Sequence, residues 1–139
     1  MKRIYLDAAA GLHNPSSLHA EGIKAARVLN QARARVARAL AAHPDEIIFT
    51  SGGTESNNLA IQGVVQSGGH IVTTTLEHPS VLETCRALER AGKATVTYVE
   101  VSPDGVVDPA DIKKALRPET QLVSVSYAAS EICTIQPIR

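Results

Sequence analysis

The sequence predicts a three-layer α/β/α fold, in which a mainly parallel sheet of about four strands has helices on both faces. Two observations support this fold class. Between residues 46 and 128, short runs rich in β-branched side chains alternate with helical segments across short loops. A long, alanine-rich helical segment over residues 16–41 precedes them. Such alternation is typical of parallel strands joined by right-handed crossovers.

The long helix is expected over residues 16–41. Its apolar side chains recur at steps of three, four or seven residues, at Leu18, Ala25, Leu29, Ala32, Val36 and Leu40. Ser16 and Ser17 are available to cap its start, since serine side chains accept hydrogen bonds from the first free N–H groups. His43-Pro44 is expected to end it, because the residue before a proline avoids the helical region.

The alternating unit occupies residues 46–128. Its expected strands are residues 47–50, 70–75, 95–99 and 122–127, and its expected helices are residues 54–66, 79–91 and 109–116. The sequence contains no internal repeat and no low-complexity linker. A single domain is therefore expected over residues 1–139.

Composition argues against several classes of protein. No apolar run approaches the ~20 residues of a membrane span, and residues 1–7 do not resemble a secretory leader, so a cytoplasmic protein without membrane contacts is expected. The two cysteines are too few for a disulfide framework, and the histidines lack zinc-ligand spacing, so no metal is expected. Residues 1–40 are basic, but aromatic residues make up only 3% of the chain, which argues against nucleic-acid binding.

The loop over residues 50–57 is the first candidate site. It leaves an expected strand, turns through Gly52 and Gly53, and enters a helix beside Thr54. Free N–H groups, the helix dipole and a hydroxyl donor together make a phosphate site. No lysine follows the glycines, so this is not a P-loop. An ordinary glycine turn with helix capping explains the loop equally well.

The loop over residues 76–80 is the second candidate, again between a strand end and a helix start. Pro79 suits the first helical position, which places His78 at the carboxyl edge of the sheet, near Gly53 and Thr54. An imidazole at that edge can stack on a ring or transfer protons. Taken without further context, a solvated loop histidine is the simpler interpretation.

Five segments of the sequence carry a family resemblance: residues 4–7, 14–19, 46–60, 77–85 and 134–138. They resemble the amino-terminal part of cysteine desulfurases, which are class V, fold-type I enzymes that use pyridoxal phosphate. The resemblance runs along essentially the whole chain, and residues 49–60 are its most specific part. It implies part of the large domain of the fold-type I architecture and a pyridoxal phosphate cofactor.

The resemblance also implies roles for individual residues. Gly53 and Thr54 would bind the cofactor phosphate, and His78 would stack on the pyridine ring and serve as the catalytic proton carrier. Glu131 matches the glutamate of the family's Asn-Asn-Glu-Ile-Gly segment. Ser130 then stands where the family has the asparagine that contacts the phenolic oxygen of the cofactor.

The sequence also departs from the family. Ala129 and Ser130 replace both asparagines of that segment, and Cys133 replaces its glycine. The family's partner for the pyridine nitrogen, its Schiff-base lysine and its persulfide cysteine lie in segments that these 139 residues do not match. We therefore expect loose, non-covalent cofactor binding and little or no desulfurase activity from these residues alone, so whether the chain acts as an enzyme stays open.

A second hypothesis is a non-catalytic α/β module that binds a phosphate ligand or another protein. Parallel strands at the edge of a sheet leave N–H and C=O groups that another chain can pair with. A homodimer or larger oligomer is therefore expected, or an assembly with a complementing chain.

Overall fold

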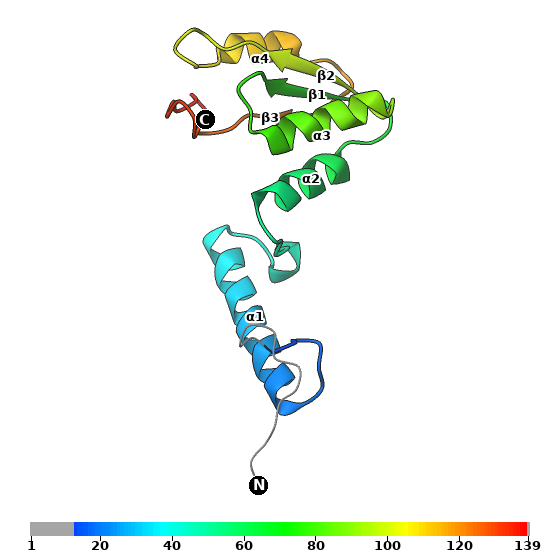
Figure 1. Cartoon of the computed structure of the whole chain (residues 1–139), viewed down its shortest axis with the longest axis vertical. Coiled ribbons are helices and arrows are strands. Elements are labelled where there is room, and N and C mark those ends of the chain that lie inside the picture. Colours follow the sequence, from blue (N-terminus) through cyan, green and yellow to red (C-terminus); the bar gives the residue numbers. More distant parts are fainter. Residues whose placement is uncertain (1–12, 139) are drawn as a thin grey trace. The chain divides into compact units, whose positions relative to one another are not determined.

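The computed structural model describes residues 13–138 (Figure 1). The chain divides into two compact units, residues 1–49 and residues 50–139. The single domain expected over residues 1–139 stays a prediction, and segment 4–7 of the resemblance lies outside the described residues. No helix in the described range is long and apolar enough to cross a membrane.

Helix α1, Ala20–Ala39, is the main element of the first unit. The expected start at residue 16 and the expected serine caps are wrong, because His19 is the N-cap and its side chain accepts from the N–H of Gly22. Both serines belong instead to a turn, in which their N–H groups donate to Asn14. Gly22 allows this turn to lie close to the first turn of α1, since a Cβ on Gly22 would be 2.3 Å from the carbonyl oxygen of Ser17.

The end of α1 also differs from the prediction. Ala41 adopts a positive φ of 53° and the N–H of Ala42 donates to the carbonyl of Ala37, which ends the helix before His43-Pro44. A short 3₁₀ helix, η1, follows over Pro44–Glu46.

The expected strand over residues 47–50 is wrong, because these residues pair with no strand in the described part of the chain. Arg33 takes the place of a strand partner. Its guanidinium donates to the carbonyl of Ile47 and lies 5.1 Å from the ring centre of Phe49. The sheet therefore has three strands rather than four.

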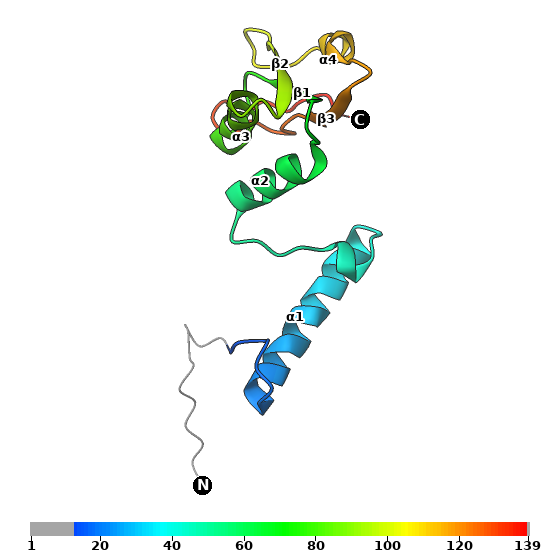
Figure 2. The ribbon, with the colours of Figure 1, turned by 90° about the vertical axis from the view of Figure 1, so that its right-hand side faces the viewer.

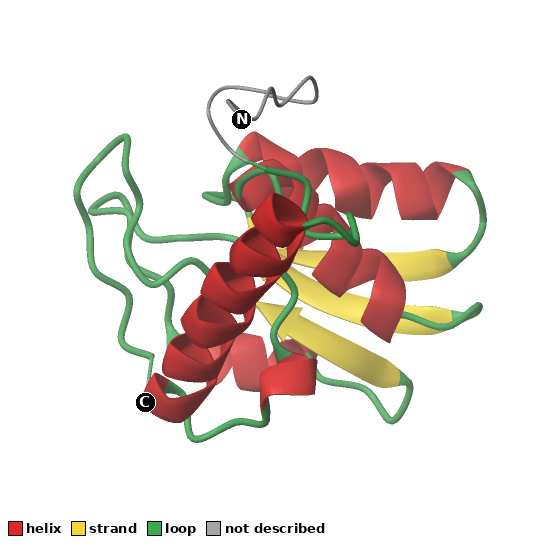
Figure 3. Cartoon of the chain, turned by 90° about the horizontal axis from the view of Figure 1, so that it is seen from below, coloured by secondary structure: helices red, strands yellow, loops and turns green. Residues whose placement is uncertain are grey.

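The second unit confirms the expected α/β class and its strand–helix alternation. Its elements, in chain order, are α2 (Gly53–Val64), β1 (Gly69–Thr74), α3 (Pro79–Arg90), β2 (Ala94–Val99), α4 (Pro109–Ala115) and β3 (Thr120–Ser124). The three strands are parallel and lie side by side in the order β2-β1-β3 (Figure 3). The central strand β1 is buried along its whole length.

Two apolar clusters lie on opposite faces of this sheet, because neighbouring side chains of a strand point to opposite sides. Ile71 of β1 packs with the helices α2 and α3, through side chains such as Ile61 and Cys85. Val72, the next residue, packs on the other face, where Ile112 of α4 contributes to the cluster. Figure 2 shows α3 and α4 on either side of the strands. The three-layer prediction is confirmed.

A buried histidine links all three strands on the α4 face. His70 is fully buried, and its ring nitrogens lie 2.8 Å from the hydroxyls of Thr97 on β2 and Thr120 on β3. Burial is the main cause that lowers the pKa of His70, and the nearby charge of Arg117 lowers it further, while Glu119 opposes the shift. The neutral ring is therefore part of the sheet structure.

The segment after β3 folds back on itself through an isolated bridge between Ala128 and Ile135. Gln136 is buried and anchors this segment, since its side chain donates to the carbonyl of Gly105 and accepts from the N–H of Val107. Gly105 suits this turn because its φ is +74°, a conformation that favours glycine.

Candidate functional site

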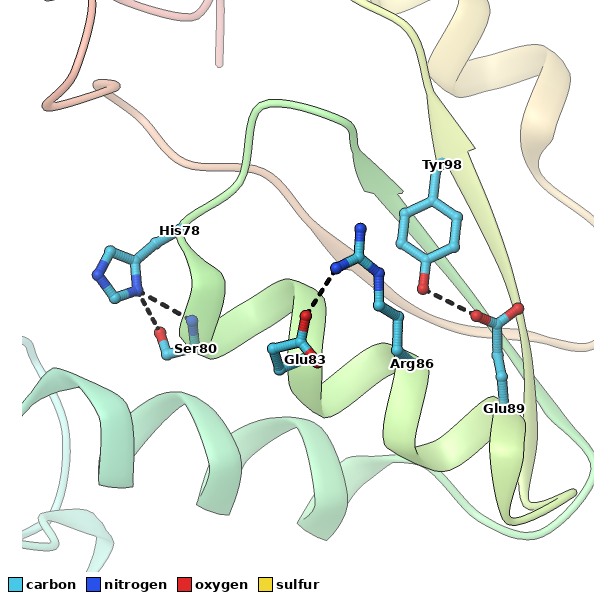
Figure 4. A network of polar contacts seen from close by, with 6 residues as sticks. All are labelled: His78, Ser80, Glu83, Arg86, Glu89 and Tyr98. Carbon is cyan, nitrogen blue, oxygen red and sulfur yellow. Dashed lines mark hydrogen bonds and ion pairs between the residues drawn. The ribbon is translucent and has the colours of Figure 1, made fainter.

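His78 lies directly before α3, at the carboxyl side of β1, and acts as the N-cap of that helix. Its Nδ1 accepts a hydrogen bond from the N–H of Ser80 at 3.0 Å and lies 2.7 Å from the Ser80 hydroxyl (Figure 4). Pro79 occupies the first helical position, as expected. The ring itself is exposed, so one edge is fixed by the helix start while its faces are accessible.

Ser80 connects His78 to helix α2. The Ser80 side chain is buried, and its hydroxyl accepts a hydrogen bond from the side-chain amide of Asn57 at 2.8 Å. Asn57 is half-buried in α2. The two helices are therefore joined by a polar contact at the point where the ring of His78 is attached.

An open hollow of about 400 Å³ lies between α2 and α3. Both Thr54 and His78 line it, so the structure brings together two of the side chains that the sequence singled out. The other lining residues are Asn58, Pro79, Ser80, Glu83, Thr84 and Ala87.

The start of α2 offers backbone N–H groups to a ligand. Its first intrahelical bond runs from the N–H of Ser56 to the carbonyl of Gly52, so the N–H groups of residues 53–55 precede the hydrogen-bonded turns. Gly52 is the N-cap and has no side chain to satisfy them. A Cβ on Gly53 would meet no atom within 4 Å, which leaves that approach open.

The loop before α2 is held by its own side chains. Glu55 accepts hydrogen bonds from the N–H and the hydroxyl of Ser51, both at 2.6 Å, and these bonds lower the pKa of its carboxyl group. The Thr50 hydroxyl lies 2.7 Å from that of Ser56. The carboxylate of Glu55, in the first turn of α2, is therefore hydrogen-bonded within the loop.

Glu77 connects the strand end that carries His78 to the segment after β3. It is buried, and its carboxylate accepts from the hydroxyl of Thr74 at 3.2 Å and from the N–H and hydroxyl of Ser126 at 2.7 and 2.8 Å. This carboxylate fixes the position of the residue beside His78.

Ser130 is exposed and does not line the hollow. It lies in the turn over residues 129–133, where its hydrogen bond to Glu131 helps to lower the pKa of that carboxyl group, after the backbone bond within Glu131 itself. The charge that His78 carries when protonated makes the smallest contribution to the same shift. The positive φ of Cys133, 56°, is a conformation that favours glycine, which is the residue of the family at this position.

The remaining candidates do not form a site. Cys85 is buried, and this burial is the main cause that raises the pKa of its thiol to about 11. Within residues 13–138, no group of three or more His, Cys, Asp and Glu side chains could hold a metal ion.

Three residues of the site were not expected from the sequence: Asn57, Glu77 and Ser80. The contacts between Asn57 and Ser80 and between Glu77 and Ser126 join residues 23 and 49 positions apart, so no local spacing could reveal these three residues. The only available signal was their presence in the two candidate loops or directly beside them.

The comparisons with known proteins agree on one family. A family model described as aminotransferase class-V matches residues 1–139. The chain is 50% identical over 130 residues to the cysteine desulfurase IscS of Dictyoglomus turgidum, which covers 91% of this chain and 33% of that protein. It is 42% identical to the putative cysteine desulfurase IscS 1 of Bacillus subtilis, across 99% of this chain and 42% of the relative. The chain thus spans between a third and about two fifths of the length of these relatives.

Solved structures give the same result. The chain matches a structure described as SspA in complex with cysteine with a TM-score of 0.81 and 40% identity, across 90% of this chain and 37% of that one. It matches DndA from Streptomyces lividans with a TM-score of 0.76 and 34% identity, across 97% of this chain and 44% of that one. With the family model covering the whole sequence, the chain belongs to the aminotransferase class-V family, and cysteine desulfurases are among its relatives.

Proposed function

We propose that this chain forms the phosphate-binding and ring-binding side of a pyridoxal phosphate site in a cysteine desulfurase. One observation carries the proposal: Thr54 and His78 line the same hollow, next to a helix start that no side chain caps. The relatives are named as cysteine desulfurases, which supports cysteine as the substrate. A cytoplasmic location is part of the proposal.

The residues present fit the cofactor. The free N–H groups at the start of α2 and the Thr54 hydroxyl would bind its phosphate, with Gly53 leaving the approach open. The exposed face of His78 would lie against its ring. The role of Ser130 at the phenolic oxygen rests on the resemblance alone, because Ser130 does not line the hollow. When bound, pyridoxal phosphate acts as an electron sink for the amino acid substrate. The chain's own part is to orient that group and to hold a proton on the imidazole of His78.

The remaining chemistry belongs to residues that these 139 do not supply. A Schiff-base lysine and a persulfide cysteine, both implied by the resemblance, have no counterpart among the matched positions. We propose that these residues alone bind the cofactor loosely and without a covalent bond, with little or no release of sulfur.

We expect Thr54→Val to weaken cofactor binding about fivefold, because one hydrogen bond of about 1 kcal/mol is lost. The probe is pyridoxine 5′-phosphate, which lacks the aldehyde and therefore does not react with surface lysines. Its fluorescence on titration with the full chain gives the dissociation constant, and inorganic phosphate should compete with it.

Thr95→Val is the matched control, since Thr95 is exposed on β2, outside the hollow. It should bind the probe like the unmodified chain. Equal affinity in the Thr54 and Thr95 variants, or a failure of phosphate to compete, would contradict the proposed site.

A second candidate function is self-association through β3. This strand pairs only with β1 among the described residues, and residues 120–125 contain neither charge nor proline. Half-exposed Val123 borders an apolar groove of about 270 Å³, which Ile112 and Ile138 also line. We propose that a second copy of the chain pairs along this edge.

We expect Val123→Lys to convert a dimer or larger assembly into monomers, because a buried charge would oppose the new contact. Sedimentation velocity of the full chain measures this change. Thr95→Lys on β2 is the control and should leave the assembly intact. An unmodified chain that sediments as a monomer would exclude this function.

A further inference from the structure

We infer that Asn57 and Ser80 are positioning residues that hold His78 in one tautomer, with its proton on Nε2. The inference rests on the proposed function, in which His78 is the group placed against the cofactor. The carrying observation is a directed chain of hydrogen bonds that runs from α2 through the start of α3 to the imidazole.

The direction of this chain follows from its members. A backbone N–H can only donate, so the bond from Ser80 N–H to Nδ1 requires a bare lone pair on that nitrogen. The neutral ring must then carry its proton on Nε2. Since Nδ1 has no proton, the Ser80 hydroxyl 2.7 Å away can interact favourably with it only by donating, and it shares the single lone pair of Nδ1 with the Ser80 N–H.

Asn57 completes the chain from the other helix. With its own proton committed to His78, the Ser80 oxygen can only accept from the side chain opposite, and the Asn57 amide nitrogen lies 2.8 Å away. Ser80 is only 7% exposed, so water competes poorly for these bonds. Asn57 therefore fixes the hydroxyl, and the hydroxyl fixes the ring.

The consequence for the site is that the two ring nitrogens have different tasks. Nδ1 is occupied by the helix start, while Nε2 lies on the side of the ring away from Ser80 (Figure 4). In the neutral ring Nε2–H is the only N–H, so any hydrogen bond that the neutral ring donates into the site comes from Nε2. If His78 served only as the N-cap of α3, the bond from the Ser80 N–H would be sufficient. The contacts of the Ser80 hydroxyl and the Asn57 amide therefore distinguish a positioning role from simple capping.

The test is ¹⁵N NMR of the histidine rings in the full chain at a pH where His78 is neutral. In the unmodified chain, His78 should show a protonated Nε2 and an Nδ1 resonance shifted upfield by hydrogen bonding. Ser80→Ala keeps the backbone bond and should move Nδ1 downfield, and Ser80→Thr, which restores the hydroxyl, should return it. Asn57→Asp should also move it downfield, because a carboxylate draws the Ser80 proton toward itself.

Asn57→Ala provides an independent variant from the other helix, and Glu83→Gln, which lines the hollow without joining the chain of bonds, should leave the resonance unchanged. If the Nδ1 chemical shift of His78 is unchanged in both Ser80→Ala and Asn57→Ala, the inference is overturned, whatever the chain binds. Pyridoxine 5′-phosphate titrations separate the two proposals. If the resonance responds as expected but the probe does not bind, the proposed function fails while the positioning contacts stand.

Discussion

Glu77→Ala is expected to lower the free energy of unfolding by about 3 kcal/mol, the upper range for leaving buried donors without a charged acceptor. The carboxylate is only 7% exposed, and it accepts from Thr74 and twice from Ser126. Alanine would leave the buried hydroxyl of Thr74 and the half-buried donors of Ser126 without this acceptor. The two segments that the carboxylate joins lie at the same edge of the sheet, so His78 should lose its fixed position as well.

Urea denaturation of the full chain measures this effect. Glu77→Gln keeps the shape and one acceptor, so its stability should fall between those of the alanine variant and the unmodified chain. Glu83→Ala is the matched control, since Glu83 is an exposed carboxylate paired with Arg86 (Figure 4), and it should change stability by less than about 0.5 kcal/mol. A Glu77→Ala variant as stable as the Glu83 variant would disprove the structural role.

Acid is expected to destabilise the second unit through His70. Burial and the charge of Arg117 lower the pKa of this imidazole in the folded chain, whereas the unfolded chain keeps the ordinary value of about 6.5. Below that pH the unfolded state binds the proton first, so the free energy of unfolding falls as the pH decreases. The slope is at most about 1.4 kcal/mol per pH unit and ends at the folded pKa.

The comparison is between urea midpoints from pH 7.5 down to pH 5. His70→Gln removes the titrating group and should flatten this pH dependence, even if the variant is less stable at every pH. His43→Gln alters an exposed histidine and should keep the slope of the unmodified chain. The same slope in the His70 variant would assign the acid sensitivity to other groups.

Local sequence was sufficient to predict most of the second unit. The middle and end of β1 consist of apolar or β-branched residues, and α3 begins with Pro79. The residue pattern of each element therefore agrees with the residues that mark its start. Thr54 and His78 could be singled out as candidates because both stand at the start of a helix beside a loop, whereas their expected roles came from the family resemblance.

The failures come from specific contacts that helix and strand periods do not encode. Residues 47–50 have the composition of a strand, but a strand needs a partner, and Arg33 binds this segment instead. Ser16 was expected to cap the helix, but it lies in a turn before α1, where its N–H donates to the Asn14 side chain. The amide–hydroxyl–imidazole chain through Asn57 joins residues 23 positions apart, which no local period can reveal.

The turn that ends in Cys133 allows the chain to be labelled at one thiol. Of its two cysteines, Cys85 is buried with a thiol pKa of about 11, whereas Cys133 is exposed. Thiol reagents react with accessible thiolates, so a maleimide dye or spin label would attach at a single place without any mutation. That place lies three residues beyond Ser130, in the turn over residues 129–133. A label there would follow the motion of this turn without any change of sequence.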